Sequence, residues 1–177
     1  MNKFYYARHG QTEWNLERKV CGRSDIPLTE TGRKQALDLA DKVKKSDLHI
    51  TKIITSPLKR AVETAKIISN INSIPVTADF RITERNFGKA EGTEYSDEFK
   101  LSVKQLAYNF ETGENAFQVA ERIFEVLDEI SRSSDTYLMV AHNGLARFVH
   151  SYFNGRDIKK SEDFFIKNSE IKEYKFK

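Results

Sequence analysis

Two short apolar runs end in the same way along this chain. Residues 4–7 lead into Arg8 and His9, residues 137–141 lead into His142, and a glycine follows each histidine within two positions. An apolar run of this length, closed by glycine, predicts a buried strand that ends in a tight loop. Because open α/β sheets carry their chemistry just past the carboxyl ends of their strands, we expect both histidines at one edge of a sheet.

Three further segments place apolar residues at helical spacing. The first is expected to begin after Thr29 as N-cap, and the second with Ser56 as N-cap and Pro57 at its first position, where a missing N–H costs nothing. The third begins at Asn115, in a pattern that resembles a capping box. The expected buried faces of the three helices are Ala36, Leu39, Ala40 and Val43; Ala61, Ala65 and Ile68; and Phe117, Ala120, Phe124, Leu127 and Ile130.

The remaining regular elements are short. Residues 52–55 and 75–78 are expected as strands, and residues 144–153 as a helix. Residues 169–176 alternate aromatic residues with lysines, a pattern typical of an edge strand with one solvent-exposed face. Strands alternate with helices throughout, which predicts a single three-layer α/β domain with a mostly parallel sheet and helices on both faces.

Two polar stretches interrupt this alternation. Residues 81–92 carry two glycines together with the carboxylate of Glu84, and residues 93–114 are the least regular part of the chain. No repeat, low-complexity tract or linker divides the sequence, so we expect one domain over residues 1–177 with a short cap insertion at about 93–114. The apolar positions expected to form one short amphipathic helix in that insertion are Leu101, Val103, Leu106 and Phe110.

Composition limits the class of protein. Of 177 residues, 31% are charged and 39% hydrophobic, which is typical of a soluble globular chain. The formal charge of +3 helps to attract an anionic substrate but is too small to indicate nucleic-acid binding. The single cysteine, Cys21, excludes an internal disulfide and favours a reducing compartment. The apolar runs are too short for a signal peptide or a membrane span, so we expect a cytoplasmic protein without a membrane partner; its oligomeric state is left open.

The charged residues near the expected strand ends have both a functional and a structural interpretation. Arg8 adds a planar set of donors suited to phosphate or carboxylate beside the two histidines, although each histidine on its own would simply cap its strand. Arg60, in the first turn of its helix, either reaches the same edge of the sheet or is a solvated surface residue. Glu84 is either a catalytic carboxylate or a loop residue paired with Arg81 or Arg85.

Five motifs, in this order, resemble those of the histidine phosphatase superfamily, also called phosphoglycerate mutase-like. Each motif alone is weak, but the five together are highly specific and span nearly the whole chain. They are Arg8-His9-Gly10 with residues 12–15; residues 25–32; residues 56–61; Glu84 with Gly88, Glu91 and Gly92; and residues 141–144.

The resemblance implies a phosphoryl-transfer site. His9 would be the nucleophile and form a phosphohistidine, which requires a free lone pair on one ring nitrogen and an acceptor for the N–H of the other. Arg8, Arg60 and His142 would surround the phosphoryl group, with Asn15 as a neutral donor. Preorganised cations stabilise the charge that gathers on the phosphoryl oxygens during transfer, so the resemblance implies no metal and no cofactor.

The remaining implied roles concern the leaving group and the substrate-binding loops. Glu84 would protonate the leaving alkoxide and then activate water. Cys21, Gly22 and Asn143 occupy further substrate-binding positions. Cys21 stands where many phosphatases of the family have Gln, and some mutases have small residues. Asn143 replaces a frequent Gly, Gln11 replaces the usual Glu, and Asn115 replaces the usual Ser.

Three functions fit these motifs. They are a phosphomonoesterase acting on a small phosphorylated metabolite, a 2,3-bisphosphoglycerate-dependent phosphoglycerate mutase, and a non-catalytic protein that binds phosphorylated ligands. A mutase must keep water from its phosphohistidine, and family mutases carry a large insertion after the Glu84 region and a C-terminal tail over the pocket. Here the insertion is short and the chain stops at Lys177, one residue past the expected edge strand. We therefore expect hydrolysis, and the complete set of five core residues argues against a mere binder.

Overall fold

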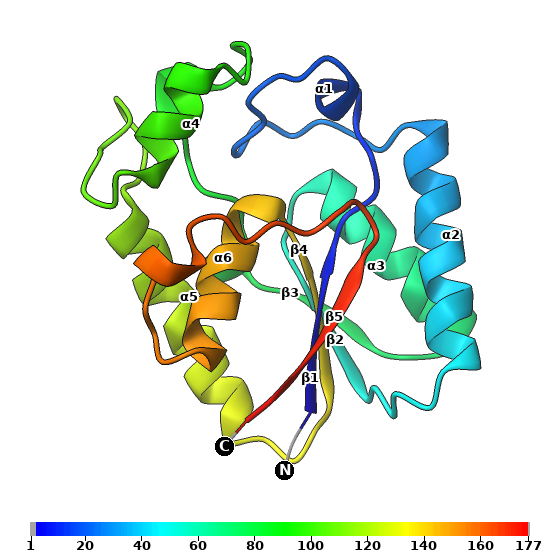
Figure 1. The fold of residues 1–177 in the computed structure, drawn as a ribbon. Coiled ribbons are helices and arrows are strands. Elements are labelled where there is room, and N and C mark those ends of the chain that lie inside the picture. The colour runs from blue at the N-terminus through cyan, green and yellow to red at the C-terminus, as the bar shows by residue number, and fades with distance from the viewer. Residues whose placement is uncertain (1–2, 177) are drawn as a thin grey trace.

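A five-stranded sheet forms the centre of the molecule (Figure 1). The computed structural model describes residues 3–176, so residues 1, 2 and 177 of the expected domain lie outside the described part. The strand order is β3-β2-β4-β1-β5, with β5 antiparallel to β1 and the other pairs parallel. The strands are β1 (Lys3–Arg8), β2 (Lys52–Thr55), β3 (Val76–Ala78), β4 (Tyr137–Ala141) and β5 (Ile171–Lys175).

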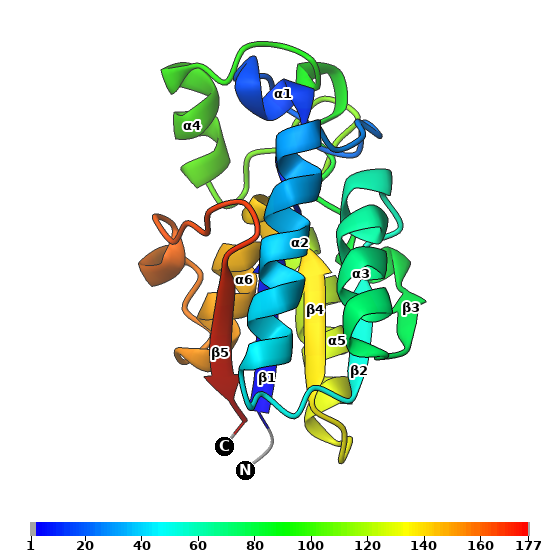
Figure 2. The same ribbon diagram turned by 90° about the vertical axis from the view of Figure 1, so that its right-hand side faces the viewer.

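Helices cover both faces of the sheet (Figure 2). Phe4 and Tyr6 of β1 pack with one pair of helices, whereas Tyr5 and Ala7 pack with the other pair. Because β1 is buried on both faces, its sequence is continuously apolar rather than alternating. The predicted three-layer α/β fold with a C-terminal edge strand is therefore confirmed. The first pair of helices is α5 (Ala116–Ser131) and α6 (Asn143–Phe153), and the second is α2 (Glu30–Lys45) and α3 (Lys59–Asn72).

Two of the predicted helix starts are confirmed and one is wrong. Thr29 caps α2 and Asn115 caps α5 in a complete capping box. However, α3 begins at Lys59 rather than at Pro57, with Leu58 as its N-cap. The hydroxyl of Ser56 lies 2.7 Å from the ring of His142, while the Lys59 N–H donates to Asp25 at 2.7 Å. A distant carboxylate therefore satisfies the helix end that Ser56 was expected to cap.

The buried face of α5 agrees with the prediction at Ala120, Leu127 and Ile130 but not at the aromatic positions. Phe117 is 53% exposed, whereas Val119, Ile123 and Val126 are buried. The small and branched residues form the face that packs on the sheet, and Phe124 lies only at its margin. The prediction was therefore wrong only for its two aromatic positions, Phe117 and Phe124, because two overlapping helical stripes were available and only packing selects between them.

The segment 93–114 contains one helix, α4 (Asp97–Lys104), and lies beyond the carboxyl ends of the strands (Figure 1). One short helix is present as predicted, and its Val103 packs on an apolar cluster. However, the helix ends before Leu106 and Phe110, and Leu101 is 64% exposed, so the rest of its predicted apolar face is wrong. Phe99 is buried instead, in a small separate cluster with Phe110. We call residues 93–114 the cap segment. The remaining short elements are α1 (Glu13–Leu16) and the 3₁₀ turns η1 (Phe80–Ile82), η2 (Gly88–Ala90) and η3 (Lys159–Ser161).

None of the helices among residues 3–176 is long and apolar enough to cross a membrane.

Candidate active site

The parallel pairing of β1 with β4 places the two motif histidines together. Arg8 is in register with Ala141, and the His9 N–H donates to the Ala141 carbonyl at 3.0 Å. The ring centroids of His9 and His142 lie 5.1 Å apart at an interplanar angle of 61°. Both rings are almost fully buried, at 4% and 1% exposed.

The hydrogen bond of the His9 ring determines its tautomer. Nδ1 lies 2.6 Å from the carbonyl oxygen of Gly10, which can only accept, so Nδ1 carries the proton and the lone pair is on Nε2. Gly10 is itself fixed by packing, because a Cβ there would lie 2.3 Å from the Gly32 carbonyl oxygen. Burial, followed by the charges of Arg60 and Arg8, holds the pKa of His9 well below its usual value. The imidazole is therefore neutral near pH 7, as a nucleophile requires.

His142 is held by groups from two other strands. Its Nε2 lies 2.7 Å from the Ser56 hydroxyl, and its backbone carbonyl accepts a 2.5 Å hydrogen bond from the Tyr6 hydroxyl. Its Nδ1 is buried and has no partner among the described residues. Burial, then Arg60 and His9, lowers the pKa of His142 well below its usual value. This ring is therefore a neutral group beside His9 with one nitrogen still available.

Two arginines flank the histidines with donors left unused. Arg60 is fully buried, with Nη1 and Nη2 each donating at 2.7 Å to the carbonyls of Ser24 and Gly22. Arg8 donates from Nη1 to the Ile166 carbonyl at 3.1 Å. The Nε atom of each arginine is buried without a partner in the described part of the chain. Arg60 is thus a buried cation, not the solvated surface residue that was the alternative.

Glu84 is buried and held by backbone donors. Its carboxylate accepts from the N–H of Arg85 at 2.8 Å and from the N–H of Gly144, in the first turn of α6, at 3.0 Å. Burial raises the pKa of Glu84 in spite of these bonds and of the nearby Arg60 charge. The alternative pairing with Arg81 is not formed, because Arg81 binds Asp79 and Glu129. A carboxyl group with a raised pKa is suited to general-acid chemistry.

Gly144 leads to a prediction about how Glu84 is positioned. A Cβ at residue 144 would lie 2.4 Å from Glu84 Oε1, so Gly144→Ala must displace the carboxylate. If Glu84 is the proton donor that the family resemblance implies, turnover of alkyl phosphates should fall by up to ~10²-fold, because a displacement of about 1 Å in a catalytic group has that effect. The gain in helix propensity is small beside the cost of displacing a buried carboxylate from its backbone donors, so thermal stability should fall modestly. Steady-state kinetics with a melting curve would check this, and unchanged alkyl-ester turnover would contradict it.

The predicted substrate-binding residues differ in how many of their polar groups are free. Asn15 lies close to Cys21, with Nδ2 3.8 Å from its Sγ, and its Oδ1 accepts from the Thr12 N–H and from Asn168. Asn143 uses its Oδ1 to accept from the Ile166 N–H at 3.0 Å. The Asn15 Nδ2 group donates to Cys21 Sγ and has a second hydrogen available, whereas the Asn143 oxygen already accepts from the Ile166 N–H.

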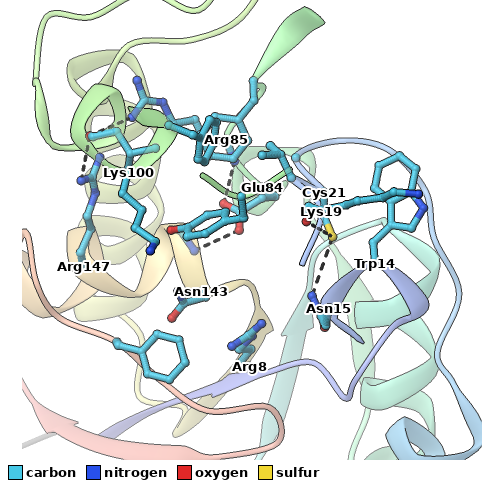
Figure 3. A pocket seen from close by; sticks show the side chains of 18 of the residues that line it. Arg8, Trp14, Asn15, Lys19, Cys21, Glu84, Arg85, Lys100, Asn143 and Arg147 are labelled. Atoms are coloured by element: carbon cyan, nitrogen blue, oxygen red, sulfur yellow. Dashed lines mark hydrogen bonds between the residues drawn. The ribbon is translucent and has the colours of Figure 1, made fainter. Parts of the chain in front are cut away.

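These residues line one pocket of 650 Å³ (Figure 3). Its wall includes Arg8, His9, Arg60 and Glu84; His142, the fifth candidate, is buried beside His9 and does not line it. Aromatic side chains form much of the remaining wall. They are Trp14, Phe87, Tyr95, Phe99, Phe164 and Phe165.

Sequence reasoning gave no role to two residues that support the site. Glu91 accepts from the backbone N–H groups of Arg23, Ser24 and Phe87, which fixes the loop that contains Gly22. Asn168 donates to the His9 carbonyl at 3.0 Å. Glu91 stands in one of the motifs, so its position carried a signal, whereas nothing in the local sequence marked Asn168.

Among the described residues, no group of three or more His, Cys, Asp or Glu side chains is arranged to hold a metal ion. The positive charge next to His9 comes from Arg8 and Arg60.

Known proteins resemble this chain along most of its length. The family profile described as histidine phosphatase superfamily (branch 1) matches residues 4–177. An uncharacterized phosphatase, PhoE of Bacillus subtilis, is 34% identical over 153 residues, which cover 85% of this chain and 77% of that protein. A probable phosphoglycerate mutase, GpmB of Salmonella typhi, is 42% identical over 91 residues, 51% of this chain and only 41% of its own length. A solved phosphoserine phosphatase of Entamoeba histolytica, in complex with 3-phosphoglyceric acid, has a TM-score of 0.85 at 26% identity, covering 99% of this chain and 91% of that one.

Proposed function

The chain belongs to the histidine phosphatase superfamily, and from this premise we propose that it hydrolyses a small phosphate monoester through a phosphohistidine at His9. The observation that carries the proposal is the hydrogen bond from His9 Nδ1 to the Gly10 carbonyl, which leaves the Nε2 lone pair free. That ring lies in a pocket that Arg8, Arg60 and Glu84 also line. A nucleophile, two cations and a carboxyl group with a raised pKa are the groups that metal-free phosphoryl transfer requires.

In the first step, His9 Nε2 attacks phosphorus and the bond from phosphorus to the leaving oxygen breaks. Arg8 and Arg60 carry unused donors that can bind the phosphoryl oxygens as charge gathers on them. Glu84 gives its proton to the leaving oxygen, so an alcohol departs instead of an alkoxide. The products of this step are the free alcohol, a phosphohistidine and the carboxylate form of Glu84.

In the second step, water attacks the phosphohistidine. Glu84, now ionised, accepts a proton from that water while the bond from phosphorus to Nε2 breaks. Inorganic phosphate leaves, and both His9 and Glu84 return to their starting states. Since the two arginines supply the positive charge throughout, we propose that the cycle needs neither a metal nor a cofactor.

A phosphoglycerate mutase is the second candidate, and the similarity to GpmB favours it. That match, however, covers less than half of GpmB, whereas the match to PhoE covers 77% of a protein named as a phosphatase. The cap segment carries one short helix, α4, and Leu101 and Tyr95 within it are exposed. Because transfer requires water to be kept from the phosphohistidine, a cap segment with one short helix supports hydrolysis over transfer. The presence of all the reacting groups argues against a non-catalytic binder.

Hydrolysis and transfer make different products from one substrate mixture. With 3-phosphoglycerate, catalytic 2,3-bisphosphoglycerate and a metal chelator, we expect release of inorganic phosphate and little 2-phosphoglycerate. Both products can be followed in one reaction by phosphorus NMR. Rapid formation of 2-phosphoglycerate with negligible free phosphate would establish a mutase instead. Loss of turnover on adding the chelator would contradict the metal-free cycle.

We further propose that the enzyme works in the cytoplasm on a small-molecule ester, without nucleic acid or membrane as partner. The single cysteine, Cys21, and the modest net charge of +3 support this.

A further inference from the structure

The pocket carries more positive charge than one phosphoryl group needs. Eight basic and three acidic residues line it, an excess larger than the +3 of the whole chain. Arg8 and Arg60 are assigned to the phosphoryl group. Arg85, although buried, uses its guanidinium on the carbonyls of Glu114, Val103 and Tyr108. The position of the remaining cations therefore bears on what else the substrate carries.

Arg147 has the same features as the two arginines of the reaction site. It is 4% exposed, lines the pocket and has no ion-pair partner among residues 3–176. Its Nη1 donates to the Val103 carbonyl at 3.2 Å, and its Nη2 is buried without any partner in that range. Burying a cation with an unfilled donor is costly unless a ligand completes its bonding. Arg8 and Arg60 share this pattern, and both have an anionic ligand in the proposed reaction.

The cap segment contributes a second cation to the pocket wall, because α4, whose Val103 carbonyl binds Arg147, also carries Lys100. Lys100 of α4 lies on the same side of the pocket as Arg147, across from Cys21 and Trp14 (Figure 3). Its ammonium is 5.9 Å from the ring centre of Tyr95, which also lines the pocket. Lys100 now pairs with Asp97 at the surface, with 41% of its side chain exposed, so its long chain can turn toward a ligand.

We propose that Arg147, assisted by Lys100, binds a second anionic group of the substrate. The inference rests on the proposed phosphatase function and names its substrate class: phosphomonoesters whose leaving group carries a carboxylate or a further phosphate. The scissile phosphoryl group lies at His9, and the second anionic group lies under the cap segment. Arg147 then determines specificity without touching the phosphorus atom.

A matched pair of esters tests the proposal. In 3-phosphoglycerate a carboxylate replaces one hydroxymethyl group of glycerol phosphate, and the two esters are otherwise alike. We expect the protein to prefer 3-phosphoglycerate in kcat/KM. Arg147→Met should reduce kcat/KM for 3-phosphoglycerate by ~10–100-fold, the effect of one charge-assisted hydrogen bond, mainly through KM. Turnover of glycerol phosphate should change little.

Two further variants complete the experiment. Lys100→Met should reduce the preference for 3-phosphoglycerate by a smaller factor, because its ammonium is partly solvated. If Arg147→Met does not fold, the result for Lys100→Met tests the proposal in its place. Lys66→Met removes an exposed lysine outside the pocket and should leave the preference intact. Equal losses on both esters in Arg147→Met would overturn the proposal and indicate that Arg147 only anchors the cap segment at Val103. An unchanged preference in both pocket variants would overturn it as well. Failure of the proposed function is distinct, since no ester, aryl phosphate included, would then release phosphate.

Discussion

Replacing His9 with alanine is expected to abolish phosphatase activity, by roughly 10⁴-fold or more for an aryl phosphate. An aryl ester has a good leaving group and depends least on Glu84, so its turnover reports the nucleophile most directly. The substitution removes the Nε2 lone pair and the donor to the Gly10 carbonyl. Losing that hydrogen bond costs about 1 kcal/mol, which a domain of ordinary stability tolerates.

The control for this variant is His49→Ala, because His49 is exposed and outside the pocket. Circular dichroism and a melting curve should show that both variants fold. Activity close to that of the intact protein in His9→Ala would remove the basis for a phosphohistidine at this residue. Conversely, a mass increase of one phosphoryl group, labile in acid and mapped to His9, would support it directly.

Glu84→Gln is expected to separate the proton donor from the groups that bind phosphate. Loss of a general acid typically costs ~10²–10⁴-fold, and we expect that loss for alkyl phosphates. Aryl phosphates should lose less in the first step, because a phenolate leaves without a proton. Arg60→Ala should instead reduce both classes by similar factors, since both place the same phosphoryl group against that guanidinium. Equal losses for the two classes in Glu84→Gln would point to a different acid.

The pH profile gives the same variant a second readout. The first step needs Glu84 protonated and His9 neutral. Burial raises the pKa of Glu84, so its proton is kept to higher pH, and lowers the pKa of His9, so the neutral ring persists to lower pH. Turnover of an alkyl ester should therefore fall as pH rises through the Glu84 pKa. In Glu84→Gln this alkaline decline should disappear, while ionisation of the substrate itself is common to both proteins.

Trapping the intermediate uses the second half of the cycle. Glu84 also activates the attacking water, so Glu84→Gln should accumulate the phosphohistidine when it is supplied with an aryl ester. A rapid initial release of one equivalent of phenol per site, followed by slow turnover, is the kinetic sign. A linear time course with no phosphorylated protein detectable would mean that water attack does not depend on Glu84.

Local sequence determined much of this fold because the signals for it are short in range. Continuous apolar runs specify strands buried on both faces, and alternation of strands with helices makes their sheet parallel. Parallel strands end at one edge, so the order of the elements places His9 and His142 at the same edge, whereas the pairing of β1 with β4 makes them neighbours. Thr29 and Asn115 cap their helices by accepting hydrogen bonds from backbone N–H groups three residues later in the chain. A four-residue stretch of sequence is therefore enough to specify each cap.

Only the tertiary structure decided which partners the polar groups have. Ser56 was expected to cap the helix, but its hydroxyl bonds His142 at 2.7 Å and accepts only weakly, at 3.4 Å, from the Leu58 N–H, while Asp25, distant in the sequence, accepts from the Lys59 N–H at the helix start. The same holds for Glu84, whose second backbone donor is Gly144, and for Arg147, whose unfilled donor has no signature in its own helix. A hydrogen bond between distant residues depends on distances set by packing, and no local pattern encodes those distances. The buried face of α5 follows the same rule: Ala120, Leu127 and Ile130 are buried as the helical period predicts, but contact with the sheet selected Val119 and Ile123 in place of Phe117 and Phe124.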